Sequence, residues 1–238
     1  MKVILTECTV NPVQSVERAA ANCYDSSPDD SGKIMNSCYN SGHHSVLEFA
    51  DFTFHISGVS RALSHQLVRH RHASYAQRSQ RYVTEDGFKY VMPPSIESKG
   101  LINSYERIMN EINNMYNFLI ENGVPQEDAR YMLPNACETV IEVKMNGREL
   151  IHFCNERLCT RAQWEIRGLA KEMKRCVAEY NDECRKFSNF LVPKCQKHLG
   201  YSFCTEHKSC GLAPKLSDVY KSFVVSTERD ITGGEWYE

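Results

Sequence analysis

The chain has 238 residues, enough for a sizeable hydrophobic core, and its 42% hydrophobic and 24% charged residues are typical of a globular protein. Lys and Arg number 28 against 30 Asp and Glu, and this balance argues against a general nucleic-acid or membrane-surface binder. The opening MKVILTECTV has no small-residue cleavage site and predicts a strand rather than a signal peptide, and no apolar run approaches the length of a membrane span.

The cysteine content points to a reducing compartment. Eleven cysteines without a CxxC pair and without an export signal favour free thiols over a disulfide framework, so we expect a cytoplasmic protein. Most of these thiols are expected to be small buried hydrophobic residues, among them Cys23, Cys137, Cys154 and Cys176.

Helices and strands alternate in the first part of the chain. Asn11 and Pro12 offer an N-cap and a first-turn proline. The alternation of FTFHIS (52–57) predicts a half-buried strand. The expected helices are 13–24, 31–42 and 60–71.

The second part begins with the clearest helix, 100–125, whose apolar residues recur at intervals of three and four before the stop signals Gly123 and Pro125. A strand over 139–147 turns at Asn146-Gly147 into a helix over 148–158, and a long helix is expected over 162–187. No linker or repeat divides the chain. The sequence therefore predicts an α+β single domain with a central sheet and packed helices.

The stretch RHRHASYAQRSQRY (69–82) holds four arginines and two histidines and lacks any carboxylate. Arginine without lysine suggests the planar fork that binds phosphate or carboxylate through two hydrogen bonds. Neither GxGxxG nor GxxxxGK[ST] occurs among the twelve glycines, so side chains must hold any phosphate. Gln66, Arg69 and His70 are spaced to share a helix face. The alternative is a set of surface arginines that pair with acids elsewhere.

This stretch resembles the signature of the flavin-dependent (alternative) thymidylate synthases: Arg69-His70-Arg71, seven residues, then Ser79. Flanking segments are similar in the same order along residues 1 to about 185: GHHSVLEF, FTFHISGVSRALSHQLVRHR, ARYMLPNACET, NGRELIHFCNER and AQWEIRGLA. The resemblance implies a mixed α/β homotetramer with active sites shared between subunits. It also implies binding of FAD, NADPH, methylenetetrahydrofolate and dUMP, with dTMP as product.

The resemblance also implies site residues. The FAD residues would be Ser45, Arg69, His70, Arg71, His72, Asn146, Arg148 and His152. The dUMP residues would be Gln66, Gln77, Arg78, Ser79, Gln80, Arg81, Arg130 and Arg157, with Arg81 on the phosphate and Arg157, the expected catalytic residue, against the uracil. His43 would lie on the folate or gate side. Gln77 stands where many members have Glu, so base chemistry by that residue is not expected.

Three alternatives accompany this interpretation. A nucleotide- or RNA-binding module could keep the fold without catalysis, although the charge balance argues against nucleic acid and the chain has no membrane partner. A cysteine nucleophile is disfavoured because none lies in the arginine stretch. Ser79 lacks a base oriented by an acid within this stretch, so hydrogen bonding is its expected role.

The C-terminal part is more individual. We expect a thymidylate synthase domain over 1–190 and a Cys-rich tail over 191–238 that packs on it or extends from it. A zinc site can be drawn in this tail, but its spacings match no standard finger and the family's activity requires no zinc. The weak candidate ligands are Cys195, His198, Cys204, His207 and Cys210.

Overall fold

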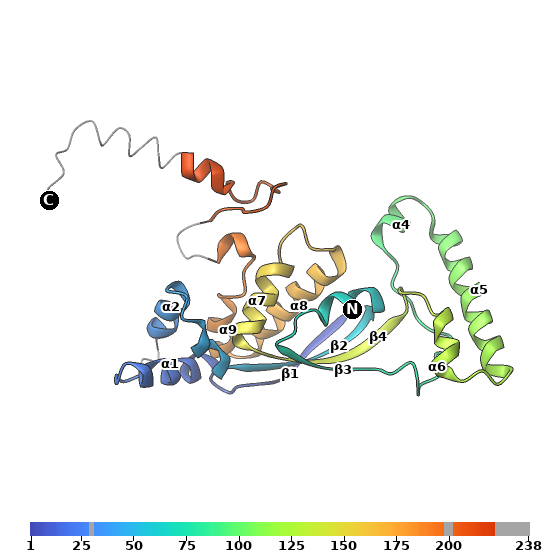
Figure 1. Ribbon diagram of the computed structural model, residues 1–238, viewed down its shortest axis with the longest axis horizontal. Coiled ribbons are helices and arrows are strands. Elements are labelled where there is room, and N and C mark those ends of the chain that lie inside the picture. The colour runs from blue at the N-terminus through green and yellow to red at the C-terminus, as the bar shows by residue number, and fades with distance from the viewer. Residues whose placement is uncertain (29–30, 198–201, 222–238) are drawn as a thin grey trace.

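The computed structural model describes residues 1–28, 31–197 and 202–221, and its centre is a four-stranded antiparallel sheet (Figure 1). The strand order is β1-β2-β4-β3. The strands are β1 (Lys2–Cys8), β2 (Asp51–Ser60), β3 (Ala73–Gln77) and β4 (Glu138–Asn146). The predicted α+β class is confirmed.

One face of the sheet forms the main core. On β2, Phe52, Phe54 and Ile56 are fully buried, and Phe54 lies opposite the buried Val143 of β4. The alternation follows from the two-residue period of a strand. Helices packed on this face complete the core (Figure 1), namely α1 (Pro12–Cys23), α7 (Gly147–Arg157), α8 (Trp164–Tyr180) and α9 (Asp182–Ser188). Two short segments join them, α2 (Lys33–Asn40) and the 3₁₀ helix η1 (His44–Phe49).

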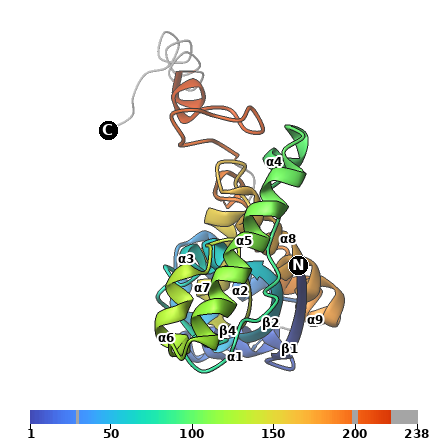
Figure 2. The ribbon, with the colours of Figure 1, turned by 90° about the vertical axis from the view of Figure 1, so that its right-hand side faces the viewer.

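A helical arm stands off the other end of the sheet (Figures 1 and 2). It contains α4 (Pro94–Ser98), α5 (Ile102–Glu121), α6 (Gln126–Ala129) and η2 (Arg130–Met132). A second small core of Phe88, Met109 and Cys137 holds it. Of the predicted apolar face of α5, Tyr116 is fully buried, whereas Ile108 is 45% exposed.

Several local predictions were wrong. The helix expected over 60–71 is α3 (Arg61–Leu67), and the chain then enters β3, a strand that the sequence did not predict. The helix expected over 162–187 is interrupted at Asn181, whose side chain accepts a hydrogen bond from the Cys184 N–H (2.7 Å) and caps α9. Asn11 makes no side-chain cap, and Cys23 is exposed.

Among the described residues, no helix combines the length and the apolar character needed to cross a bilayer. The boundary predicted between residues 1–190 and 191–238 stays a prediction. The described part of the tail begins with the 3₁₀ helix η3 (Lys194–Gln196), which lies against α7.

Gly147 fixes how closely α7 approaches η1. Its N–H donates to the Ala50 carbonyl at 2.6 Å, and a Cβ there would lie 2.6 Å from the Leu47 carbonyl oxygen and 2.7 Å from the Phe187 ring. We expect Gly147→Ala to lower the free energy of unfolding by about 1–3 kcal/mol through overpacking, measured by urea denaturation. Gly168→Ala on α8 is the matched control, because its Cβ meets only a flexible methionine methyl at 3.9 Å. Equal effects of the two substitutions would contradict this packing argument.

Candidate active site

A cavity of about 730 Å³ opens between α7, η1 and the start of the tail. Four of the residues predicted to bind FAD line it: His72, Asn146, Arg148 and His152. Its other walls include Tyr39, His44, Glu48, Lys194, Lys197, Phe203 and Thr205. Its volume lies within the range of about 300–1,000 Å³ that is usual for small-molecule and cofactor sites.

The start of α7 positions two of these residues. The Asn146 side chain accepts a hydrogen bond from the Glu149 N–H (2.9 Å) and so caps the helix. Arg148, one residue further, donates to a Glu48 oxygen at 2.7 Å. Both side chains of this pair are about half exposed, 53% and 44%. An exposed pair contributes only about 0–1 kcal/mol, so a phosphate group can displace Glu48 from Arg148.

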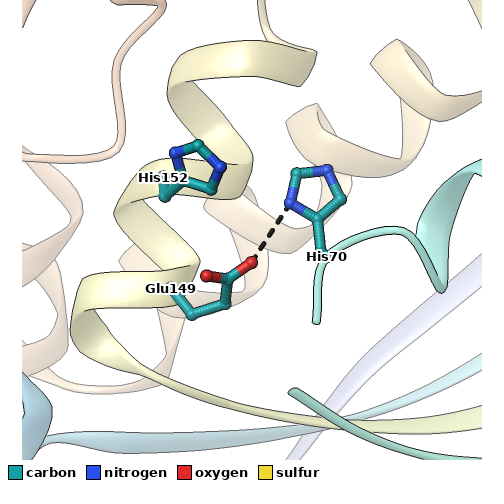
Figure 3. A group of neighbouring side chains, drawn as sticks. All are labelled: His70, Glu149 and His152. Carbon is teal, nitrogen blue, oxygen red and sulfur yellow. Dashed lines mark hydrogen bonds and ion pairs between the residues drawn. The ribbon is translucent and has the colours of Figure 1, made fainter. Parts of the chain in front are cut away.

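A buried chain of three polar side chains lies beside this cavity. His70 Nδ1 is 3.1 Å from a Glu149 oxygen, as Figure 3 shows, and Arg157 Nε donates to His70 Nε2 at 3.0 Å. Because the guanidinium can only donate, Nε2 must accept, and the imidazole proton lies on Nδ1, facing the carboxylate. His70 is therefore a neutral link between an anion and a cation. His70 and Glu149 are each 5% exposed.

The same residues form a potential metal-binding group with His152, since one ligand atom from each lies within 4.8 Å of the others. Both ring nitrogens of His70 are already engaged, one as donor and one as acceptor. A metal would have to displace Arg157 or Glu149 from that ring. The arrangement therefore suits the holding of Arg157 better than the binding of an ion.

Tyr75 of β3 fixes the backbone that carries His70. Its hydroxyl lies 2.9 Å from the Leu67 carbonyl and 2.8 Å from the His70 carbonyl, within donating distance of both. Burial, and next the negative charge of Glu149, raise the pKa of this hydroxyl, so it stays a donor. The ring of Phe153 packs edge-on against the imidazole at 5.0 Å between centroids. Tyr75 thus fixes the backbone at His70, and Phe153 packs against its ring.

The remaining predicted FAD residues are exposed near this region. Ser45 lies in η1, and His43, the predicted folate or gate residue, precedes it; neither lines the cavity, although His44 between them does. Arg69 and Arg71 are exposed, and within the described part of the chain neither forms an ion pair. The helix face expected for Gln66, Arg69 and His70 is not formed, because α3 ends at Leu67.

Strand β3 divides the arginine stretch into two groups. Its five residues pair with β4 from Ala73↔Met145 to Gln77↔Ile141. At about 3.4 Å per residue, the strand separates Arg71 from Arg78 by about 20 Å or more. One group therefore lies beside the cavity at the end of β4, and the other lies near its beginning.

Acidic residues partner the second group. Arg81 donates from Nε (3.1 Å) and Nη2 (2.9 Å) to one Glu127 oxygen, and Arg130 Nε donates to the Glu127 carbonyl (3.0 Å). Arg78 lies 3.4 Å from Glu85, whose pKa is raised by burial against the opposing charge of Arg78. In this structure Arg78 and Arg81 therefore match the alternative stated above, in which the arginines of the stretch pair with acids elsewhere in the fold.

The polar neighbours of this group are engaged by nearby atoms. Gln77 Nε2 donates to Thr139 Oγ1 at 3.2 Å, and Ser79 Oγ accepts from the Arg81 N–H at 3.1 Å, the backbone role expected for that serine. Half-buried Gln66 lies on α3.

The structure brings one cysteine to this group, which the sequence did not predict. Gln80 Nε2 lies 3.6 Å from Cys137 Sγ. Burial, and next the negative charge of Glu85, raise the pKa of this thiol to about 11. Because the thiolate is the reactive form, Cys137 is no nucleophile at neutral pH.

Residues from distant parts of the chain complete the cavity, and sequence reasoning missed them. Lys194 and Lys197 bring positive charge from the tail, while Tyr39 and Phe203 bring aromatic rings. Nothing in the sequence signals that these segments meet. For Glu149 a signal existed, because it precedes His152 by three residues and therefore shares its helix face.

Comparison with known proteins shows the family of the chain. The family model described as thymidylate synthase complementing protein matches residues 4–180. A flavin-dependent thymidylate synthase of Geobacter sulfurreducens is 50% identical over 190 residues, 74% of this chain and 82% of that protein. One of Clostridium tetani is 40% identical over 251 aligned positions, 92% of this chain and 97% of that protein.

The chain belongs to the thymidylate synthase complementing protein family, the family of the flavin-dependent thymidylate synthases. A third relative, the flavin-dependent thymidylate synthase of Pyrococcus furiosus, is 40% identical over 223 residues, covering 87% of this chain and 90% of its own length. The resemblance drawn from the arginine stretch is confirmed. Membership of the thymidylate synthase complementing family favours the enzyme over the alternative of a non-catalytic binding module.

Glu149 and Glu48 each contact a basic side chain, but the buried Glu149 should contribute more to the stability of the fold than the exposed Glu48. We expect Glu149→Ala to lower the free energy of unfolding by about 1.5–3 kcal/mol, because it leaves His70 and the charge of Arg157 without their buried partner. Glu48→Ala, which removes the exposed partner of Arg148, should cost about 0–1 kcal/mol. Urea denaturation of the two variants measures the difference. Equal losses would show that the buried chain contributes no more than a surface ion pair.

Proposed function

We propose that this chain converts dUMP to dTMP, with methylenetetrahydrofolate as the one-carbon donor and NADPH as the reductant through FAD. Family membership supports the reaction, and the cavity lined by His72, Asn146, Arg148 and His152 is the observation that carries the proposal. When bound, FAD supplies the redox chemistry, and the protein supplies position and electrostatics.

The cavity fits an anionic, ring-bearing cofactor. Arg148, Lys194 and Lys197 can face a diphosphate, and Tyr39 and Phe203 offer rings to flat groups. Arg69, His70, Arg71 and Ser45 complete the proposed FAD residues. Since Arg69 and Arg71 form no ion pair within the described chain, they can bind phosphate without first losing a carboxylate.

The group beyond β3 is the proposed dUMP site. Arg81 would hold the phosphate with Arg130, both beside Glu127. A phosphate dianion can replace Glu127 on Arg81 at little cost, because both partners are 50% exposed. The other proposed contacts are Gln66, Gln77, Arg78, Ser79 and Gln80. Gln77 is an uncharged amide that is hydrogen-bonded to Thr139. It would therefore orient the substrate and would not remove a proton from it.

Arg157 is the proposed catalytic residue. His70 accepts its Nε–H, and within the described part of the chain its terminal nitrogens carry no hydrogen bond, so they remain for the uracil. An enolate-like uracil, the form in which C5 is nucleophilic toward the one-carbon unit, carries negative charge on its C4 carbonyl oxygen. A guanidinium held in place by the neutral His70 and by Glu149 would stabilise that charge without reorganising. His70 and Glu149 are thus positioning residues.

The separation of the two groups supports the proposal of a homotetramer with shared sites. The nine residues of β4 place them about 27 Å apart at ~3.4 Å per residue. Flavin and uracil must meet for reaction, so the dUMP group of one subunit would face the FAD cavity of another. The exposed apolar residues of α5, including Ile108, Met115 and Phe118 at 45, 46 and 57%, supply a surface for such an assembly.

The direct test is turnover. Protein incubated with dUMP, methylenetetrahydrofolate, FAD and NADPH should form dTMP, and NADPH oxidation should increase when dUMP is added. Colourless protein that gains no flavin from FAD, and forms no dTMP, would contradict the proposal.

Arg157→Gln should retain FAD, seen by its absorbance, and lower turnover by about 10²–10³-fold, the usual effect of removing one donor to a developing oxyanion. Arg175→Gln on the exposed face of α8 is the control and should leave turnover unchanged, since the ion pairs of that arginine within the described chain are with Glu172 and Glu179. Full activity of Arg157→Gln would show that Arg157 does not take part in the reaction.

Substitutions in the two arginine groups should affect the binding of different ligands. We expect Arg81→Ala to weaken dUMP binding by about 10- to 100-fold, as the loss of a charge-assisted hydrogen bond predicts, while FAD is retained. Arg71→Ala should weaken FAD by a similar factor and leave dUMP binding to the FAD-loaded protein largely unchanged. Calorimetry with each ligand measures both. If each variant lost both ligands equally, the division into two groups would be wrong.

A further inference from the structure

Four cysteines from two parts of the chain line one small cavity. Cys159 follows the end of α7, Cys195 lies in η3, and Cys204 and Cys210 lie in the described part of the tail. The cavity has a volume of about 40 Å³, close to the ~30 Å³ that a single water molecule occupies in the liquid. All four are free thiols. The cavity is therefore little larger than one water molecule, and its wall offers four sulfur atoms.

Backbone hydrogen bonds hold two of these cysteines, Cys195 and Cys204, in place. The Phe203 N–H donates to the Cys195 carbonyl at 3.1 Å. Cys204 donates to the Pro214 carbonyl at 2.7 Å and accepts from the Leu216 N–H at 3.0 Å. Residues 195, 204 and 214–216 thus form one connected unit, with Cys204 only 9% exposed.

Two donors hold the sulfur of Cys210 in place. It receives hydrogen bonds from the Thr160 side chain and from the backbone N–H of Leu212. Gly211, with φ of +83°, forms the turn that brings this N–H back to the sulfur.

Apolar packing does not account for the fold of this segment. Within residues 202–221, only Cys204 and Ala213 are buried among the hydrophobic residues, whereas Leu212 is 72% and Tyr220 70% exposed. Small segments without a core are usually held by disulfides or by a structural metal.

We propose that Cys159, Cys195, Cys204 and Cys210 bind one structural Zn²⁺ ion. Four thiolates are the ligand set of closed, tetrahedral zinc sites, with Zn–S distances of about 2.3 Å. Among the described residues no three of these sulfurs lie mutually within 4.8 Å, so binding draws them inward, and each thiol releases its proton on binding. The observations that support this site do not rest on the proposed catalytic function.

This ligand set differs from the candidates that the sequence offered. His207 is exposed and does not line the cavity, and His198 lies outside the described residues. Cys159, which the sequence did not single out, takes a place because α7 ends beside η3. The same tail residues reach the FAD cavity, since Lys194 and Thr205 line both. The ion would thus fix one wall of that cavity.

The test is metal analysis of the full chain purified under reducing conditions without chelator. Wild-type protein should contain about one zinc per chain, as a single tetrahedral site requires. Cys159→Ser and Cys204→Ser should each lose zinc, whereas Cys23→Ser, an exposed cysteine at the end of α1, and His207→Ala should retain it. Zinc in Cys159→Ser at the wild-type level would overturn this ligand set.

A second measurement does not depend on the folding of any variant. Replacing zinc by Co²⁺ in the wild-type protein should give the intense near-ultraviolet absorption of thiolate-to-cobalt charge transfer. Fewer than about 0.2 zinc per chain together with no such absorption would overturn the proposal, because a four-thiolate site binds both ions. Iron with labile sulfide in place of zinc, or a mass two hydrogens lower that shows a disulfide among these cysteines, would overturn it equally.

Discussion

The contact on which the candidate active site depends is the hydrogen-bonded chain from Glu149 through His70 to Arg157. It joins the first turn of α7, the segment after α3 and the last turn of α7 in a region where two of the three residues are almost fully buried. A charged guanidinium is expensive to orient in a site shielded from water. A neutral imidazole lowers that cost, because its Nε2 accepts a hydrogen bond from the cation and its Nδ1–H donates one to the anion.

The fold explains why these three residues meet. Gly147 lets α7 start close to η1, and the Asn146 cap sets its first turn. Arg157 follows Glu149 by eight positions, about two helical turns at 3.6 residues each. Tyr75 of β3 then fixes the backbone at His70. The strand that divides the arginine stretch is therefore also the element that supports the buried chain.

Much of the fold was readable from the sequence. The alternation of β2 and β4, the Asn146-Gly147 turn and the spacing of α5 predicted real elements. The sequence did not predict strand β3 because its inward face is short, with only Ala73 and Tyr75 as apolar residues before the polar Gln77. The strand forms by pairing with the main chain of β4. The contact between His70 and Glu149 spans 79 positions, and the contact of the tail with α7 depends on tertiary packing, so no local pattern could reveal either. The family signature supplied the candidate ligand residues, whereas the roles of Glu149 and Cys159 came from the structure.

The most direct measurement of the central contact is the tautomer of His70, read from ¹⁵N chemical shifts and couplings of histidine-labelled protein, with the signal assigned by its absence in His70→Asn. The account predicts a neutral ring at neutral pH that carries its proton on Nδ1 and leaves Nε2 bare to accept from Arg157. A proton on Nε2, alone or together with Nδ1, would contradict it, because Arg157 could not then donate to that ring.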